Sequence, residues 1–242
     1  MTYPYWMSRR KLQPPGKSGY IPIMPDDSCI DVSHAAPYQR AGHIRWAEVA
    51  PLARVAILRA VYRESPDESY RRHYLDARSA GLGTGAYAFL RPGGMDRQIA
   101  AFLAVAAPRR GDLCVADFED HNGGIPTADE LETWCAAVEA HTAADVVVYS
   151  RASLIDAHIP GGHPFRGRKR PLWLSQYPIA HGGELAAFEP GHHLDIPDGW
   201  MGDECLFWQY TSKGVVPGID GAVDRSVGSI ADLERRWPGV RA

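Results

Sequence analysis

The sequence predicts an α/β protein that folds as a single irregular barrel of alternating strands and helices. The chain has 242 residues, which suits one large barrel core. Short β-branched runs alternate with longer amphipathic segments, a pattern typical of strands joined by crossover helices, and this indicates a parallel sheet. The segment between residues 160 and 199 is rich in Gly, Pro and His and has no helical pattern. The second half of the barrel is therefore predicted to be irregular.

Eight segments have the length and composition of strands. They are residues 29–32, 55–60, 83–89, 113–118, 146–149, 172–176, 205–210 and 222–224. Helices are predicted at residues 67–80, 96–107, 128–141, 153–158 and 230–237, with a short turn near Trp46. Asp96 and Thr127 are predicted to be N-caps, and Gly81 is predicted to end the first long helix.

The first 26 residues differ in composition from the rest of the chain. Pro14, Pro15, Pro22 and Pro25 oppose regular structure there. We interpret residues 1–26 as an N-terminal extension and residues 27–242 as one barrel domain, since no internal repeat and no second composition zone is visible.

The charge balance argues against nucleic acid as a partner. The formal net charge is −3, and the sequence lacks the broad excess of basic residues that nucleic-acid binding usually needs. A local basic run, Arg166, Arg168, Lys169 and Arg170, is interpreted as a solvated loop. No apolar segment approaches the length of a bilayer crossing, so we expect no stable membrane association. We expect a monomer.

The chain has four cysteines, Cys29, Cys114, Cys135 and Cys205. They are far apart and lack the spacing of a metal knuckle, so we expect buried free thiols, which suit a reducing cytoplasm. The basic residues at positions 9–11 are not followed by an apolar segment, and we expect no secretory signal. A substrate outside the cytoplasm would then require another route of release.

Acidic residues stand at the ends of three predicted strands. Asp117 and Glu119 follow an apolar run and are separated by one residue, so both side chains project to the same face. Asp31 and Asp224 end two other predicted strands. A single such Asp is usually a turn former or a cap. Several of them at the ends of parallel strands indicate an active site, because gathering like charges costs stability.

Clustered carboxylates bind a hard cation or cleave a glycosidic bond. In the second case one carboxyl group is protonated and another is ionised, and crowding by negative charges raises the pKa of one of them. We predict that Glu119 is the proton donor, because its longer side chain reaches further from the barrel rim. Asp117 beside it would supply the negative charge that raises its pKa. Aromatic residues at the same strand ends offer flat surfaces to sugar rings and favour the carbohydrate cleft: Tyr87, Tyr149, Trp173, Tyr177, Trp208 and Tyr210.

The sequence resembles glycoside hydrolase family 25, the Chalaropsis-type lysozymes that include many phage endolysins. The matching segments occur in order between about residue 28 and residue 237. They include Ile30-Asp31-Val32-Ser33-His34, Gly85-Ala86-Tyr87, Arg91-Pro92-Gly93, Asp117-Phe118-Glu119, Val148-Tyr149-Ser150, Leu172-Trp173-Leu174-Ser175-Gln176-Tyr177, Trp208-Gln209-Tyr210-Thr211-Ser212 and the segment from Pro217 to Asp224.

The resemblance implies a TIM-like barrel of five β/α units followed by three further strands. It implies hydrolysis, without a cofactor or metal, of the β-1,4 bond between N-acetylmuramic acid and N-acetylglucosamine in bacterial peptidoglycan, with net retention. Glu119 would be the proton donor, and Asp31, Asp117 and Asp224 its acidic companions. Arg59, Arg91 and Gln176 would join the aromatic residues Tyr87, Tyr149, Trp173, Tyr177 and Trp208 in binding substrate. Whether Asp117 attacks the sugar or supports the N-acetyl group as nucleophile stays open.

The sequence departs from the family after the second predicted strand. The family's Ala-Thr-Glu-Gly is replaced by Ala60-Val61-Tyr62-Arg63, so an acidic position is lost unless Glu64 compensates for it. His73 stands where Asn is usual, and Ala88 where His often follows the Gly-Ala-Tyr segment. These changes affect expected substrate contacts, while the four acidic residues remain.

Three hypotheses follow. The first is an active muramidase, a phage endolysin made in the bacterial cytoplasm and released by a holin or another non-classical route. The second is a catalytically impaired wall-binding or phage structural protein on the same fold. The third is a divalent-metal hydrolase, which ten histidines keep open, although His181, His192 and His193 lack the helical spacing of common zinc sites.

Overall fold

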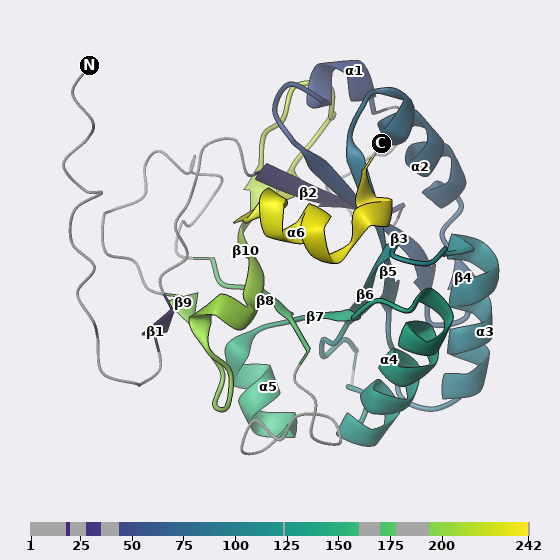
Figure 1. Ribbon diagram of the computed structural model, residues 1–242, viewed down its shortest axis with the longest axis vertical. Coiled ribbons are helices and arrows are strands. Elements are labelled where there is room, and N and C mark those ends of the chain that lie inside the picture. Colours follow the sequence, from purple (N-terminus) through teal and green to yellow (C-terminus); the bar gives the residue numbers. More distant parts are fainter. Residues whose placement is uncertain are drawn as a thin grey trace.

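The computed structural model describes residues 18–19, 28–34, 44–122, 124–159, 170–177 and 194–241. Eight strands form a closed barrel in this part of the chain (Figure 1). They are β2 (Ser28–Val32), β3 (Val55–Tyr62), β5 (Gly83–Phe89), β6 (Leu113–Asp117), β7 (Val147–Ser150), β8 (Leu172–Ser175), β10 (Cys205–Gly214) and β11 (Val223–Gly228). All eight predicted strands are confirmed, with ends that shift by a few residues.

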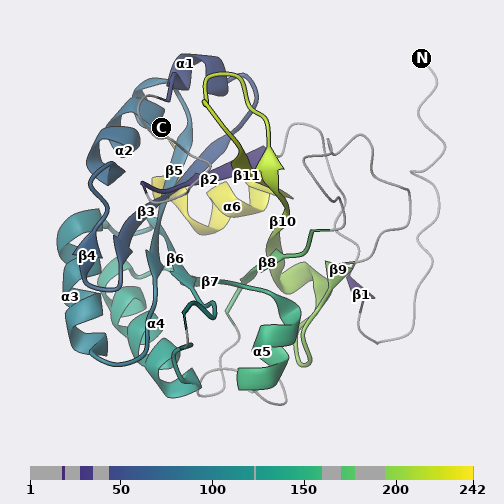
Figure 2. The same ribbon diagram turned by 180° about the vertical axis from the view of Figure 1, so that it is seen from behind.

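The helices follow the predicted order. They are α1 (Trp46–Val49), α2 (Tyr70–Ser79), α3 (Met95–Ala106), α4 (Ala128–Thr142), α5 (Ala152–His158) and α6 (Ile230–Arg236), with 3₁₀ turns η5 (Gly202–Glu204) and η6 (Pro238–Val240). Figure 2 shows α2, α3, α4 and α5 outside the ring of strands. Five strand–helix units are therefore followed by β8, β10 and β11, as the family resemblance implies.

Two of the three predicted helix boundaries, Thr127 and Gly81, are confirmed. Thr127 caps α4, since its side chain accepts from the Glu130 backbone N–H while Glu130 accepts from the Thr127 N–H. Gly81, at φ 89°, ends α2: its N–H donates to Arg78 O, and the Leu82 N–H donates to Ala77 O. The prediction for Asp96 was wrong, because α3 begins after Gly94 and Asp96 lies in its first turn.

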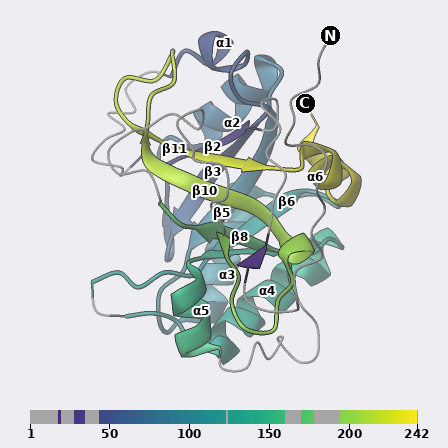
Figure 3. The same ribbon diagram turned by 90° about the vertical axis from the view of Figure 1, so that its left-hand side faces the viewer.

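The barrel closes through two antiparallel pairings. Neighbouring strands from β2 to β10 run parallel, whereas β11 is antiparallel to both β10 and β2. Figure 3 shows β10, β11 and β2 side by side. The sheet is thus mixed rather than parallel throughout, since β11 follows β10 without a crossover helix between them.

Two apolar layers hold the barrel together. The larger layer lies between the strands and the outer helices and includes Phe102, Trp134 and Val138. The second fills the barrel interior and is continued by residues of α6 and η6, among them Leu233 and Trp237. Trp237 is fully buried, and its indole N–H donates to Asp145 O at 2.7 Å. The C-terminal helix therefore closes one end of the barrel, which leaves the other end for a site.

Two short strands lie outside the barrel. β1 (Ser18–Gly19) pairs antiparallel with β9 (Leu194–Asp195), so part of the predicted extension contacts the later part of the chain. β4 (Ser65–Pro66) forms a hairpin with the end of β3. The boundary predicted near residue 26 falls outside the described residues and stays a prediction.

The prediction for the basic run was wrong at Arg170. Its side chain is 2% exposed and forms ion pairs with Glu139 at 2.8 Å and with Glu132, both on α4. Buried charges of opposite sign need such partners, and here they join α4 to the start of β8. Residues 166, 168 and 169 lie outside the described residues.

All four cysteines are buried and free, as predicted. Within the described residues, the helices are too short or too polar to cross a membrane.

Candidate active site

Side chains that point into the barrel change from apolar to polar toward its open end. On β6 the inward series runs from Leu113 and Val115 to Asp117 and then Glu119. On β2 the series is Cys29, Asp31 and Ser33. Because strand side chains alternate between faces, each strand delivers its last inward residues to the same mouth.

A cavity of about 240 Å³ opens at this mouth. Its lining residues are Asp31, Ser33, Arg59, Tyr87, Phe89, Val115, Asp117, Glu119, Tyr149, Trp173, Tyr177, Gln209 and Asp224. All four predicted acidic residues are therefore brought together, and they come from β2, β6, the segment after β6, and β11. Their catalytic roles stay a prediction.

Asp224 reaches the mouth in a way that the sequence analysis did not foresee. It was placed at the end of a strand, but it is the second residue of β11. Because β11 is antiparallel to β2, its beginning lies beside the end of β2, and Asp224 pairs in register with Asp31.

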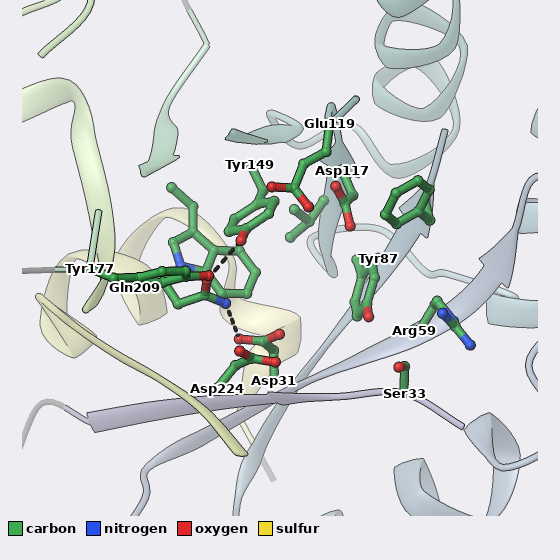
Figure 4. A pocket seen from close by; sticks show the side chains of 13 residues that line it. Asp31, Ser33, Arg59, Tyr87, Asp117, Glu119, Tyr149, Tyr177, Gln209 and Asp224 are labelled. Carbon is green, nitrogen blue, oxygen red and sulfur yellow. Dashed lines mark hydrogen bonds between the residues drawn. The ribbon is translucent and has the colours of Figure 1, made fainter. Parts of the chain in front are cut away.

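The four carboxyl groups form two pairs that face one another across the cavity (Figure 4). Asp117 and Glu119 lie next to each other on one side, and Asp31 and Asp224 lie next to each other on the other side. Asp31 and Asp117 are almost fully buried, at 8% and 6% exposure. The arrangement places two ionisable groups on each side of a space that a sugar ring can enter.

Gln209 connects the acidic pair on β2 and β11 to the aromatic wall. Its Nε2 donates to Asp31 Oδ2 at 2.8 Å, while its Oε1 accepts from the hydroxyls of Tyr149 at 2.7 Å and Tyr177 at 2.5 Å. Trp173 packs edge-on against Tyr149, with ring centroids 4.8 Å apart. These contacts fix the orientation of Asp31 and of two hydroxyl groups that face the cavity.

Burial and mutual repulsion raise the pKa values of the acidic residues in the site. Burial raises the pKa of Asp31 and of Asp117 well above the ordinary range, and neighbouring carboxyl groups raise each pKa further. Burial, followed by repulsion from Glu119, raises the pKa of Asp224 to about 7. Within the described residues, Asp117 Oδ1 is buried without a hydrogen-bond partner, so its negative charge is poorly compensated.

The pKa of Glu119 is raised for a different reason from the one expected. Crowding by other carboxylates was predicted to raise it, but burial is the main cause, and the positive charge of Arg151 opposes the rise. The direction suits a proton donor near neutral pH.

The cation in the cavity wall, Arg59, is already paired. Its guanidinium donates to Asp67 Oδ2 at 3.0 Å. The Asp67 side chain is fully buried and also accepts from the His34 N–H and from Ser69. Through these hydrogen bonds Asp67 connects the loop after β2 to β3. Asp67 therefore lies before α2, which begins at Tyr70 and not at residue 67 as predicted. Arg59 in turn opposes the rise in the pKa of Asp117.

Five of the eight predicted substrate contacts line the cavity: Arg59, Tyr87, Tyr149, Trp173 and Tyr177. Of the tyrosines that line the cavity, Tyr177 is the most exposed, at 48%.

The other three predicted contacts lie outside the cavity lining. Trp208 is buried against the outer core, and its indole N–H donates to Gln176 O at 2.8 Å. The Gln176 side chain accepts from the Asp195 N–H, and the Arg91 guanidinium donates to Gly124 O. The predicted rim position of Trp208 and Tyr210 was wrong, because the inward residue of this part of β10 is Gln209.

Sequence reasoning missed four lining residues: Ser33, Phe89, Val115 and Gln209. Strict alternation could have found three of them. Ser33 is two residues after Asp31, Val115 is two before Asp117, and Phe89 is two after Tyr87. Gln209 could have been found from its neighbours Trp208 and Tyr210. Both are large aromatic residues that pack on the apolar outer face of the strand, so the residue between them points inward.

The departure after the second predicted strand is a tight hairpin. Arg63, at φ 55°, and Glu64 form its turn. Glu64 pairs with Arg97 at 3.0 Å and does not line the cavity, so it does not replace the acidic residue of the family pattern there. Tyr62 instead stacks on Phe89, with ring centroids 5.1 Å apart.

His73 is a buried residue of α2 and not part of the site. Its ring packs edge-on against Trp46 at 5.7 Å. Within the described residues, no group of three or more His, Cys, Asp or Glu side chains is arranged to hold a metal ion. His181, His192 and His193 lie outside the described residues.

Comparison with known proteins identifies the family. The model of the glycosyl hydrolases family 25 matches residues 30–219, which is more than half of the chain. The chain belongs to glycosyl hydrolase family 25.

Lysozyme M1 of Streptomyces globisporus is 28% identical over 222 residues, covering 81% of this family 25 chain. The chain spans 66% of the length of that relative. The crystal structure of the lysozyme from Streptomyces coelicolor is 27% identical, with a TM-score of 0.67, covering 88% of this chain and 97% of that one. The catalytic domain of endolysin ply40 from bacteriophage P40 of Listeria monocytogenes shares the fold, at 19% identity and a TM-score of 0.63, covering 86% of this chain and 95% of that one.

Asp224→Asn is expected to stabilise this family 25 domain at alkaline pH. The pKa of Asp224 is about 7 in the folded protein, against an ordinary value of 3.8. A folded-state pKa above the unfolded one means that stability falls as pH rises through this window. Urea unfolding should therefore show a larger free energy of unfolding for the variant at about pH 8, and little difference at about pH 4.

Asp232→Asn is the matched control for this prediction. Asp232 is exposed, and its pKa is lowered by Arg235. Its replacement should not raise stability at the alkaline pH. Equal stability of the Asp224 variant and the parent at both pH values would contradict the conclusion that burial and repulsion from Glu119 raise the pKa of Asp224.

Proposed function

We propose that the protein is a peptidoglycan hydrolase that cleaves the β-1,4 bond between N-acetylmuramic acid and N-acetylglucosamine. The observation that carries the proposal is the pair formed by Glu119 and Asp117, which faces Asp31 and Asp224 across one cavity. Membership of family 25 and the similarity to Lysozyme M1 support it.

In the proposed reaction Glu119 donates its proton to the glycosidic oxygen as the bond to the sugar carbon breaks. Asp117 carries the negative charge that stabilises the positive sugar carbon, either as nucleophile or by holding the substrate's N-acetyl group in place. Water then adds to that carbon and returns a proton to Glu119. Asp31 and Asp224 bound the other side of the cavity, and Gln209 holds Asp31 in position. Tyr87, Tyr149, Trp173 and Tyr177 offer rings to the sugar faces.

Glu119→Gln is expected to abolish cleavage with the fold intact, because the amide keeps the shape but supplies no acidic proton. The measurement is mass spectrometry of digested peptidoglycan, scored for new reducing N-acetylmuramic acid ends, with circular dichroism as a check of folding. Glu64→Gln makes the same chemical change outside the cavity and should leave the product yield unchanged. Full turnover by Glu119→Gln would remove Glu119 from the proposed role.

We further propose that cleavage retains the configuration of the sugar carbon. Support comes from the closeness of Asp117 to Glu119 on one strand end, since retention requires a group near the proton donor that can stabilise an intermediate. Proton NMR of the first products should show the β-anomer before it equilibrates. Initial release of the α-anomer would overturn the proposal.

We also propose that the enzyme serves phage-induced lysis and is made in the cytoplasm of a bacterial host. The fold shared with the catalytic domain of endolysin ply40 and the four buried free thiols support this role. Expression in bacteria should lyse the cells when a holin is co-expressed, and the Glu119→Gln variant should not do so. Lysis by the enzyme alone, without the pore, would contradict release through a holin.

A further inference from the structure

Arg151 follows directly after β7, beside the proposed active site. On β7 the inward residues are Val147 and Tyr149, both in the interior core. The backbone of Arg151 is still extended, with φ −100° and ψ 148°. Strand alternation therefore continues to this residue, and Arg151 is the next position of the inward series, at the mouth of the barrel.

The register of β6 and β7 places Arg151 level with Glu119. Asp117 and Tyr149 are partners in the parallel pairing, and Glu119 and Arg151 each follow two residues later. Two hydrogen bonds keep the strand ends in register past the last pair: the Phe118 N–H donates to Tyr149 O at 2.9 Å, and Ser150 Oγ donates to Phe118 O at 2.7 Å. The positive charge of Arg151 accordingly opposes the rise that burial causes in the pKa of Glu119.

Arg151 differs from the other arginine of the site in its availability. The Arg59 guanidinium is held by the buried Asp67. Arg151 is exposed, and among the described residues no carboxylate lies within ion-pair distance of its guanidinium. A cation near Glu119, just outside the residues that line the cavity, is suited to an anionic part of the substrate.

We propose that Arg151 binds a carboxylate that the glycan carries beside the bond to be cleaved, so that the enzyme prefers anionic to neutral glycan strands. The proposal rests on the proposed function, since N-acetylmuramic acid bears a lactyl group whose carboxylate is free when the peptide is absent. Guanidinium and carboxylate match in geometry through two parallel hydrogen bonds.

Binding of that carboxylate also acts on the proton donor. Pairing offsets the positive charge of Arg151, which otherwise opposes the raised pKa of Glu119. The ionisable groups of the cavity that interact with Glu119 are Asp31, Asp117, Asp224, Tyr149 and Tyr177, and each of the three Asp residues is negative when ionised. An anionic substrate therefore favours the protonated form of Glu119 at the moment of cleavage.

The test uses two substrates that differ only in charge. Glycan strands freed of peptide by an amidase carry the lactyl carboxylate, and coupling to methylamine converts the same strands to neutral amides. The enzyme forms are the parent, Arg151→Gln, Arg151→Lys and the control Arg97→Gln, which removes an exposed arginine on α3 away from the cavity. Values of kcat/KM are measured for each form on each substrate.

We expect the parent to prefer the anionic strands by about tenfold, a ratio that corresponds to ~1.4 kcal/mol. Arg151→Gln should lose this preference by slowing on the anionic strands, Arg151→Lys should keep part of it, and Arg97→Gln should match the parent. A parent without the preference, or an Arg151→Gln variant that keeps it, overturns the proposal.

Calorimetry in the Glu119→Gln background separates this proposal from the proposed function, because it measures binding without turnover. Tighter binding of the anionic strands that disappears on adding Arg151→Gln supports the role of Arg151 even if no cleavage is found. Equal binding of both strands overturns it even if cleavage is normal.

The pH profile provides a readout that a merely structural role would not change. On neutral strands, loss of Arg151 removes the charge that lowers the pKa of Glu119, so the alkaline limb of kcat/KM should move to higher pH in Arg151→Gln. An unchanged limb would contradict the electrostatic effect of Arg151 on Glu119.

Discussion

The antiparallel pairing of β11 with β2 is the constraint on which the site depends. It closes the barrel, and it sets Asp224 directly opposite Asp31. If β11 ran parallel to its neighbours, its first residues would lie at the end that α6 covers, and Asp224 would be far from the mouth. Closure and assembly of the acidic site are therefore one event, because the same backbone hydrogen bonds produce both.

One end of the barrel contributes mainly to stability, and the other end carries the acidic site. At the closed end, α6 and η6 add apolar side chains such as Leu233 and Trp237 to the interior core. At the open end, Asp31 and Asp117 are buried where ionisation is costly. Burial of apolar surface at one end offsets the cost of gathered carboxyl groups at the other.

Much of this architecture could be predicted from the sequence, since it depends on local patterns. The apolar runs that end in Asp31 or Asp117 predicted both the strands and the polar residues at the mouth of the barrel. The antiparallel direction of β11 could not be predicted in this way, because direction depends on pairing between residues far apart in the chain. For the same reason Arg170 was misread: its neighbours in sequence are basic, whereas its partners Glu132 and Glu139 lie on α4.

Within the site, the predicted rim positions were wrong where they were chosen by residue type and not by the alternation of side chains along the strand. Trp208 and Tyr210 were chosen because aromatic rings suit sugars, but alternation places them against the outer core and turns Gln209 inward. Gln209 then makes three hydrogen bonds in the cavity, one through its amide nitrogen and two through its amide oxygen. The same rule extends the inward series of β7 to Arg151. The physics of the strand thus decides which residues reach the cavity, and the chemistry of each side chain decides what it does there.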